Sequence, residues 1–188
     1  MTDVYENPPV FENDSYRIRF LQKEDCAGLL RVYSDEAAIP LFNSDNCNGD
    51  DFRYTTEARM MQAIDFWLRE FGQRYYVRWT VCDKREGDMP VGTVELFRRQ
   101  AVDAFTDCGL LRLDLRSDHE TEEEIGALLS LIVPPAFDLF SCSRIAAKAI
   151  PAAAARIAAL KTFGFRLSPE KLIGHDGTEY GDYWVLER

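Results

Sequence analysis

The sequence predicts a mixed α/β fold in which a mostly antiparallel sheet is flanked by helices. A strand, a turn and a long helix follow one another from Leu110 to Phe140, three strand-like segments lie close together over residues 75–116, and helical segments stand on both sides of them. Closely spaced strands are typical of an antiparallel meander, whereas a parallel pair needs a crossover helix. We therefore expect a meander followed by one βαβ crossover.

The segment from Leu110 to Phe140 shows both periodicities clearly. Apolar and charged residues alternate from Leu111 to Arg116, which predicts a strand with one buried face. Thr121 and the three glutamates after it form a capping-box pattern, and apolar residues then recur at helical spacing as far as Phe140. The turn between strand and helix leaves backbone N–H groups that could bind phosphate, although acidic residues crowd it.

The remaining elements follow from the same two periodicities and from turn residues. Before the central segment, we expect a strand over 16–21, helices over 23–34 and 55–71, a loop over 42–52, and strands over 75–83 and 91–98. After it, we expect a short strand over 144–150, a helix over 151–163 with Pro151 in its first turn and Gly164 at its end, a hairpin turn at 174–177, and a last strand over 183–186.

Composition narrows the class of protein. A chain of 188 residues suits a single domain over residues 1–188, with residues 1–14 as an N-terminal arm. Its formal charge of −10 argues against nucleic acid or an anionic membrane as a partner. Five scattered cysteines and two histidines predict neither a disulfide framework nor a metal site. No signal peptide or membrane-spanning run is evident, so we expect a cytoplasmic protein.

Two short motifs, taken with the order of the elements, resemble a known family. VGTVELF over residues 91–97, the strand-to-helix segment from Leu110, and LKTFGF over 160–165 occur in the order found in the GNAT acetyltransferase superfamily, most closely in the branch of ribosomal-protein N-terminal acetyltransferases. The resemblance covers residues 16–188. It implies the GNAT fold, acetyl-CoA as acyl donor, and direct attack of a primary amine on the thioester.

The resemblance also implies where acetyl-CoA would bind. In that family a Q/R-x-x-G-x-G/A loop binds the diphosphate, and here the pattern falls on Glu120, Glu123 and Ile125, none of which matches. A carboxylate at about 5 Å from the diphosphate would cost on the order of 3 kcal/mol at an effective dielectric of about 20. The residues assigned to cofactor binding are Leu115, Arg116, Glu120, Thr121, Glu123, Glu124 and Ile125.

Two further family residues are replaced in this chain. The family's Asn falls on Ala153, and its general-acid Tyr falls on Leu160. Tyr180 or Tyr183 in the last hairpin could supply the missing acid, and we assign Tyr180 to that role. These departures also leave a second hypothesis, in which the chain is a GNAT-fold binding or interaction module that has lost acyl-CoA binding.

Candidate bases lie on the strands that flank the substrate groove in the family it resembles. Glu95 or Asp114 could act as general base toward an attacking amine. The structural alternative is an ion-pair ladder in which Arg112 and Arg116 flank Asp114 on one strand face.

Acidic residues recur in each segment that this fold would place near the substrate. They are Glu95, Asp114, Asp50, Asp51 and Asp182. We therefore expect a net negative groove and a small-molecule amine or a basic peptide as partner. An oligomer remains open.

Overall fold

The computed structural model describes residues 3–188, and each segment predicted as helix or strand is confirmed within a few residues of its expected ends. The helices are α1 (Cys26–Tyr33), α2 (Glu57–Gly72), α3 (Glu122–Leu139) and α4 (Ala154–Phe163), with 3₁₀ turns η1 (Lys23–Asp25), η2 (Ile39–Leu41), η3 (Lys84–Glu86) and η4 (Ser117–His119). The strands are β1 (Phe11–Glu12), β2 (Tyr16–Phe20), β3 (Val77–Asp83), β4 (Met89–Arg98), β5 (Gly109–Leu115), β6 (Arg144–Lys148), β7 (Arg166–Leu167), β8 (Leu172–Ile173), β9 (Glu179–Tyr180) and β10 (Tyr183–Glu187).

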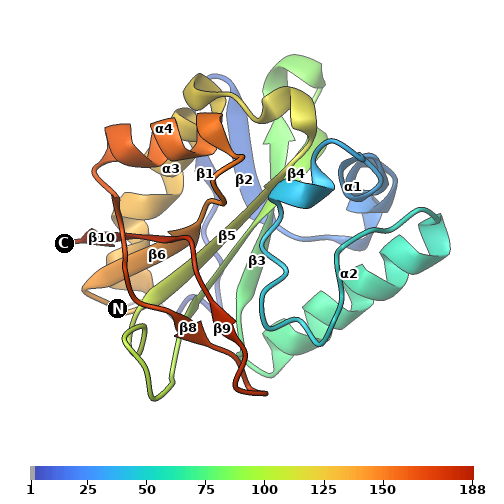
Figure 1. Ribbon diagram of the computed structural model, residues 1–188. Coiled ribbons are helices and arrows are strands. Elements are labelled where there is room, and N and C mark those ends of the chain that lie inside the picture. The colour runs from blue at the N-terminus through green and yellow to red at the C-terminus, as the bar shows by residue number, and fades with distance from the viewer. Residues whose placement is uncertain (1–2) are drawn as a thin grey trace.

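One eight-stranded sheet organises the chain, in the order β1-β2-β3-β4-β5-β6-β10-β7 (Figure 1). Its described neighbours are antiparallel except β5 and β6, which are parallel and connected through α3. The predicted mixed, mostly antiparallel sheet with one crossover is therefore confirmed. The expected hairpin at 174–177 is also present, joining β8 to β9 in a separate small sheet.

The two faces of the central strands pack against different helices. On one face, alternating apolar residues such as Trp79, Val94 and Leu113 join Ile125 and Leu129 of α3 in one hydrophobic core. On the other face, α1 and α2 form their own apolar cluster, and Figure 1 shows these two helices apart from α3 and α4. Period-2 alternation thus places every second residue of β3, β4 and β5 toward α1 and α2.

The parallel pair diverges along its length. β5 pairs with β6 only at Gly109, Leu110 and Leu111, while the rest of β5 continues to pair with β4. A V-shaped gap in backbone pairing therefore opens toward the carboxyl ends of the two strands. The parallel pair at the centre of the sheet is therefore splayed.

Helix ends follow local chemistry. The side chain of Thr121 accepts a hydrogen bond from the backbone N–H of Glu124 at 3.2 Å, so the N-cap of α3 is confirmed. Gly164 ends α4 in the left-handed region with φ of +101°, as expected. Pro151 is not in the first turn of α4, because that helix begins three residues later, at Ala154, and Pro151 lies in the preceding turn.

The N-terminal arm adds an edge strand, since β1 pairs with β2. Trp79 Nε1 donates to the carbonyl oxygen of Pro9 at 3.0 Å, which fixes the arm against the sheet. Met1 and Thr2 of the predicted arm lie outside the described residues. Within residues 3–188, no helix is long and apolar enough to span a membrane.

Candidate functional site

Polar side chains form two rows across the middle of the sheet, on the face toward α1 and α2. In the first row Arg78 of β3 lies opposite Glu95 of β4, which lies opposite Arg112 of β5. In the second row, Thr80, Thr93 and Asp114 stand opposite one another in the same way. Cross-strand neighbours in this register are close enough to bond, so the antiparallel pairing itself assembles the site.

Glu95 is an ionised carboxylate held by two guanidinium groups. It is 1% exposed; Arg78 Nη2 donates to Oε2, and Arg112 Nη1 donates to Oε1 at 2.9 Å. Burial raises the pKa of Glu95, but Arg78 and Arg112 outweigh burial and hold this pKa below its usual range. Both oxygens of this candidate base are therefore occupied.

Asp114 has a different environment. Tyr33 donates its hydroxyl proton to Oδ2 at 2.8 Å, and Arg78 Nη1 lies 3.4 Å from the same oxygen, but Oδ1 is buried without a hydrogen-bond partner. Burial raises the pKa of Asp114 above its usual value despite Arg78 and Tyr33. The predicted ladder around Asp114 is wrong, because Arg112 pairs with Glu95 and Arg116 points to a separate network.

The loop over residues 42–52 covers the row at the end nearer β6. Lys148 Nζ contacts both carboxylate oxygens of Asp45 at 2.6 Å, and Tyr183 donates to Asp45 Oδ2 at 3.0 Å. Arg112 Nη2 donates to the backbone carbonyl of Asp45 at 2.8 Å. Tyr180, the predicted acid, lies with its ring centroid 5.8 Å from Lys148 Nζ. Tyr183 therefore belongs to the buried polar cluster, and Tyr180 stands at its edge.

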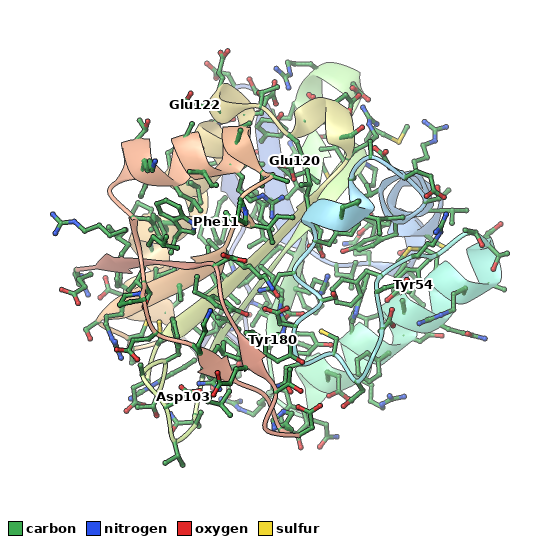
Figure 2. The ribbon with its side chains drawn as sticks, viewed as in Figure 1. Phe11, Tyr54, Asp103, Glu120, Glu122 and Tyr180 are labelled. Atoms are coloured by element: carbon green, nitrogen blue, oxygen red, sulfur yellow. The ribbon has the colours of Figure 1, made fainter. Side chains whose placement is uncertain are left out.

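A further buried ion pair closes the gap between β5 and β6. Arg156 of α4 donates through Nε and Nη2 to Glu120, and its Nη1 donates to the backbone carbonyl of Leu41 at 3.1 Å. Both charged side chains are almost fully buried, at 5% and 7% exposure. Figure 2 shows Glu120 on the turn that leads into α3, beside the beginning of α4.

The space left between β5, β6, α3 and α4 is a cavity of about 10 Å³. It is lined by Asn43, Leu111, Arg112, Leu113, Ile125, Leu129, Ala147, Lys148, Arg156 and Leu160. A cavity of this size holds about one water molecule. In this conformation the groove is therefore filled by the protein's own side chains.

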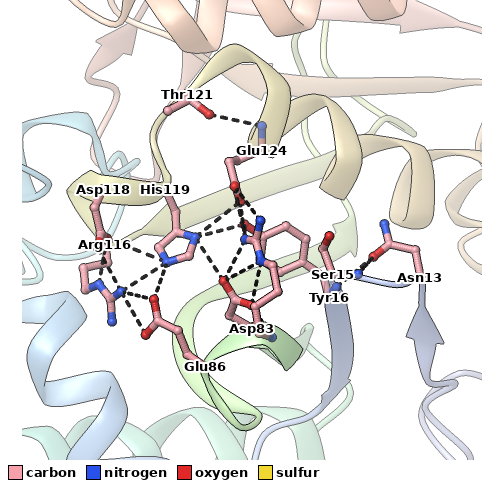
Figure 3. A network of polar contacts seen from close by, with 11 residues as sticks. Asn13, Ser15, Tyr16, Asp83, Glu86, Arg116, Asp118, His119, Thr121 and Glu124 are labelled. Atoms are coloured by element: carbon pink, nitrogen blue, oxygen red, sulfur yellow. Dashed lines mark hydrogen bonds and ion pairs between the residues drawn. The ribbon is translucent and has the colours of Figure 1, made fainter.

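The turn before α3 is fixed by a network of charged side chains around His119 (Figure 3). Arg116 binds Glu86 at 2.9 Å and Asp118 at 2.7 Å. Tyr16 Oη lies 2.9 Å from His119 Nδ1, and Arg116 Nη2 donates to His119 Nε2 at 3.2 Å. The side chains at this turn bond mainly to one another.

The other residues predicted to bind the cofactor differ in their burial. Leu115 and Ile125 are 0% exposed and belong to the hydrophobic core. Glu123 is exposed to solvent at the first turn of α3. Glu124 bonds to Arg85 at 3.0 Å and so does not complete a reciprocal capping box with Thr121.

One cluster near this turn has metal-ligand residue types. Asp83, Glu86 and His119 bring possible ligand atoms within 4.8 Å of one another. His119 Nδ1 faces Asp83 at 4.0 Å, whereas Nε2 faces Glu86 at 3.7 Å, so the two carboxylates approach different ring nitrogens. Both carboxylates also bind arginines, Arg85 and Arg116. This geometry is that of an ion-pair network.

The predicted acidic groove does not form at the cavity between β5 and β6. Asp114 and Glu95 are buried beneath other groups, and Asp50 pairs with Arg59 at 2.7 Å. Among the described residues that line the cavity, the charged side chains are three cations and no carboxylate: Arg112, Lys148 and Arg156. The expectation failed because sequence alone shows how many acids approach a region, but not which cations neutralise them.

Sequence reasoning missed three cations of the site, Arg78, Lys148 and Arg156, and gave Arg112 the wrong partner. Polar residues recur two apart at Arg78 and Thr80, at Thr93 and Glu95, and again at Arg112 and Asp114. That repetition was the available signal for a buried polar row. Arg156, by contrast, is a single arginine in an Ala-rich helix, and nothing near it in sequence marks its partner.

A larger hollow of about 420 Å³ lies at the opposite end of β5. It is bordered by two ion pairs that are largely open to solvent, Arg98 with Asp107 and Arg188 with Asp138. None of the residues that line it belongs to the polar rows or to β5 and β6, so the candidate site remains the gap between those two strands.

No protein-family model and no curated protein sequence matches this chain. Solved structures do match. RimJ of Mycobacterium smegmatis, in complex with CoA-disulfide, superposes with a TM-score of 0.70 at 15% identity, over 95% of this chain and 86% of that one. A GNAT-family acetyltransferase from Bacillus anthracis gives 0.69 at 11% identity, over 95% and 98%. A ribosomal-protein-alanine acetyltransferase from Vibrio fischeri gives 0.65 at 17% identity, over 96% of both chains.

These likenesses extend over nearly the whole chain. At such low sequence identity, these likenesses establish the fold of the chain and do not establish its activity. The chain has the fold of the GNAT acetyltransferases.

Proposed function

We propose that this chain is an N-acetyltransferase that moves an acetyl group from acetyl-CoA to a primary amine. The observation that carries this proposal is the divergence of β5 and β6 beyond Leu111, within a GNAT fold. Strands that separate leave unpaired backbone groups facing one another, and these can bind an extended ligand. One structural neighbour is itself a complex with a CoA derivative.

The chemistry required of the chain is modest. The amine nitrogen attacks the thioester carbonyl carbon, the carbon–sulfur bond breaks, and the amine loses a proton while the thiolate gains one. Asp114 suits the role of base, because Oδ1 has no partner and burial raises its pKa toward the range in which a carboxylate accepts protons effectively. Glu95 instead keeps Arg78 and Arg112 in place. Tyr180 is the proposed acid.

The acceptor remains a small-molecule amine or a basic peptide in this proposal. Asp114 is 0% exposed, so an amine can reach Oδ1 only when the surrounding side chains move. The loop over residues 42–52 and the Glu120–Arg156 pair are the covering groups that would have to shift.

A second candidate function is a binding module without acyl transfer. The observation that favours it is the cavity of about 10 Å³ where a cofactor many times larger would lie. The absence of the family's loop glycines supports it, because close approach of a phosphate to the backbone is easiest at glycine.

Titration calorimetry with acetyl-CoA and with CoA, combined with a thiol-release assay over a panel of primary amines, separates the two functions. Amine-dependent release of CoA supports the transferase, and its loss in Asp114→Asn supports the proposed base. Binding of neither acetyl-CoA nor CoA by the folded protein, with no thiol release, overturns the transferase and leaves the module.

A further inference from the structure

The cavity between β5 and β6 is lined by apolar side chains, by Asn43 and by three cations. The carboxylates that neutralise these cations, Glu95, Asp45 and Glu120, are not among its lining residues. The three cations therefore face the cavity, and the carboxylates that neutralise them lie behind or beside them. Such a surface attracts an anion, because a low-dielectric wall strengthens the field of the cations.

The three cations differ in the partners that neutralise them. Arg112 binds Glu95 and the carbonyl of Asp45, both of which belong to the polar cluster described above. Lys148 binds both oxygens of Asp45 at 2.6 Å. Arg156 is different, because the carboxylate of its partner comes from Glu120, on the turn between η4 and α3.

Glu120 is a costly partner for Arg156. Burial raises the pKa of Glu120 even though Arg156 opposes the shift, and the nearby Asp114 carboxylate raises it further. A buried ion pair whose carboxylate is poorly solvated gains little net stability from its own contact. Exchange of this carboxylate for another anion therefore meets less resistance than exchange at Glu95, whose pKa is lowered.

We propose that Arg156 is the anion-binding residue of the groove and that Glu120 occupies it in the free protein, so that a diphosphate-bearing thioester enters by displacing the Glu120 carboxylate. This inference rests on the proposed function and names the residue that controls access to the groove. A guanidinium binds carboxylate and phosphate oxygens through the same fork of N–H donors, so the hydrogen bonds of Arg156 are preserved in the exchange. Glu120 then acts as an internal competitor of the acyl donor.

The test compares four proteins by titration calorimetry with acetyl-CoA, inorganic pyrophosphate and pantetheine, which lacks the diphosphate. Glu120→Gln keeps the side-chain shape and frees Arg156, so acetyl-CoA and pyrophosphate should bind roughly tenfold tighter or more than in the wild type, with no gain for pantetheine. Glu122→Gln removes the same charge from an exposed neighbour and should leave affinity within about twofold. The double variant Glu120→Gln/Arg156→Gln should lose the gain.

The outcomes separate this inference from the proposed function. Tighter binding in Glu120→Gln without any thiol release supports Arg156 as the anion site and overturns the transferase. Thiol release in the wild type, with acetyl-CoA affinity unchanged by Glu120→Gln, keeps the transferase and overturns the exchange. An equal gain for pantetheine also overturns it, because that ligand carries no anion for Arg156.

A measurement on the wild type covers the case in which Glu120→Gln does not fold. Sulfate keeps its charge between about pH 8 and about pH 5, so a change in its affinity reports on the protein. Burial raises the pKa of Glu120 and of the nearby Asp114, so acidification protonates these two carboxylates before ordinary ones and leaves Arg156 and Arg78 charged. The thermal shift caused by sulfate should therefore grow as the pH falls, and should not do so in Arg156→Gln. A pH-independent shift in the wild type overturns the proposal.

Discussion

Arg78 and Glu95 lie directly opposite each other on β3 and β4 and form an ion pair that is 2% and 1% exposed. Arg112 approaches the same carboxylate from β5, so one negative charge is shared between two cations across three strands. Removing charges from water costs several kcal/mol each, and only close, well-aligned partners compensate. The polar row is therefore stable as a unit and costly to break at one position.

Glu95→Gln should lower the free energy of unfolding by about 3–5 kcal/mol, because it removes the carboxylate of Arg112 and leaves buried Arg78 only its longer contact with Asp114, at 3.4 Å. Urea denaturation measures the change. Asp138→Asn is the matched control, since it breaks an ion pair with Arg188 that is more than half exposed on both sides, and should cost less than about 1 kcal/mol. Similar losses in the two variants would show that Glu95 is not the hub of the buried row.

Much of the fold could be predicted because one-dimensional periodicity determines which face of an element is buried. The alternation at Leu111, Leu113 and Leu115 identified β5 and its apolar face correctly. The same alternation could not identify the partners of charged residues. The structural alternative for Asp114 paired it with Arg112 and Arg116 on its own strand, but Arg112 bonds across the sheet to Glu95, because strand register decides which neighbours meet.

The ion pair that closes the groove could not be predicted from the sequence, for a related reason. Glu120 and Arg156 are 36 residues apart, and they meet only because α3 crosses over to β6 and α4 then returns across the sheet. A glutamate in an acidic turn and an arginine in an Ala-rich helix are each ordinary residues. Their pairing is a property of the tertiary fold.

Gly164→Ala should destabilise the protein by about 1–2 kcal/mol, since Gly164 ends α4 with φ of +101° and a Cβ disfavours that conformation. The new methyl group itself would be accommodated, because its nearest neighbour, Leu186 Cδ1, would lie at 3.5 Å. Gly72→Ala is the control: a Cβ there meets nothing within 4 Å, and stability should stay equal or rise by about 1 kcal/mol. Thermal unfolding of both variants decides whether backbone conformation is the cause.

Restoring the family's loop pattern at Ile125 should fail. Ile125 is 0% exposed and packs in the main core, so Ile125→Gly should cost about 4 kcal/mol or more from the lost side chain and the added helix flexibility. Gly126→Ala, one position further along α3, should instead stabilise by about 0.5–1 kcal/mol, because a Cβ there meets nothing within 4 Å. If Ile125→Gly retains wild-type stability in chemical denaturation, the position is a loop site rather than a core site.

His119 should make the protein less stable in mild acid. Arg116 can only donate to Nε2, so the imidazole is neutral with its proton on Nδ1, toward Tyr16 Oη. Burial lowers the pKa of His119, and Arg116 adds to this, although Asp118, Asp83 and Glu86 oppose the shift. Below about pH 6.5 the unfolded chain therefore binds the proton first, and stability falls as the pH falls toward the lower folded pKa.

His119→Asn keeps a polar group near Nδ1 and removes the titration, so its free energy of unfolding should fall less than that of the wild type between about pH 7 and about pH 5.5. The other histidine of the chain, His175, is exposed, and His175→Asn should leave the wild-type slope unchanged. Glu120, Glu124 and Asp114 have raised pKa values and contribute the opposite sign in acid, so the difference between variants is the informative quantity. Urea denaturation at several pH values supplies it. Parallel slopes for the wild type and His119→Asn would mean that the network in Figure 3 does not hold a neutral imidazole.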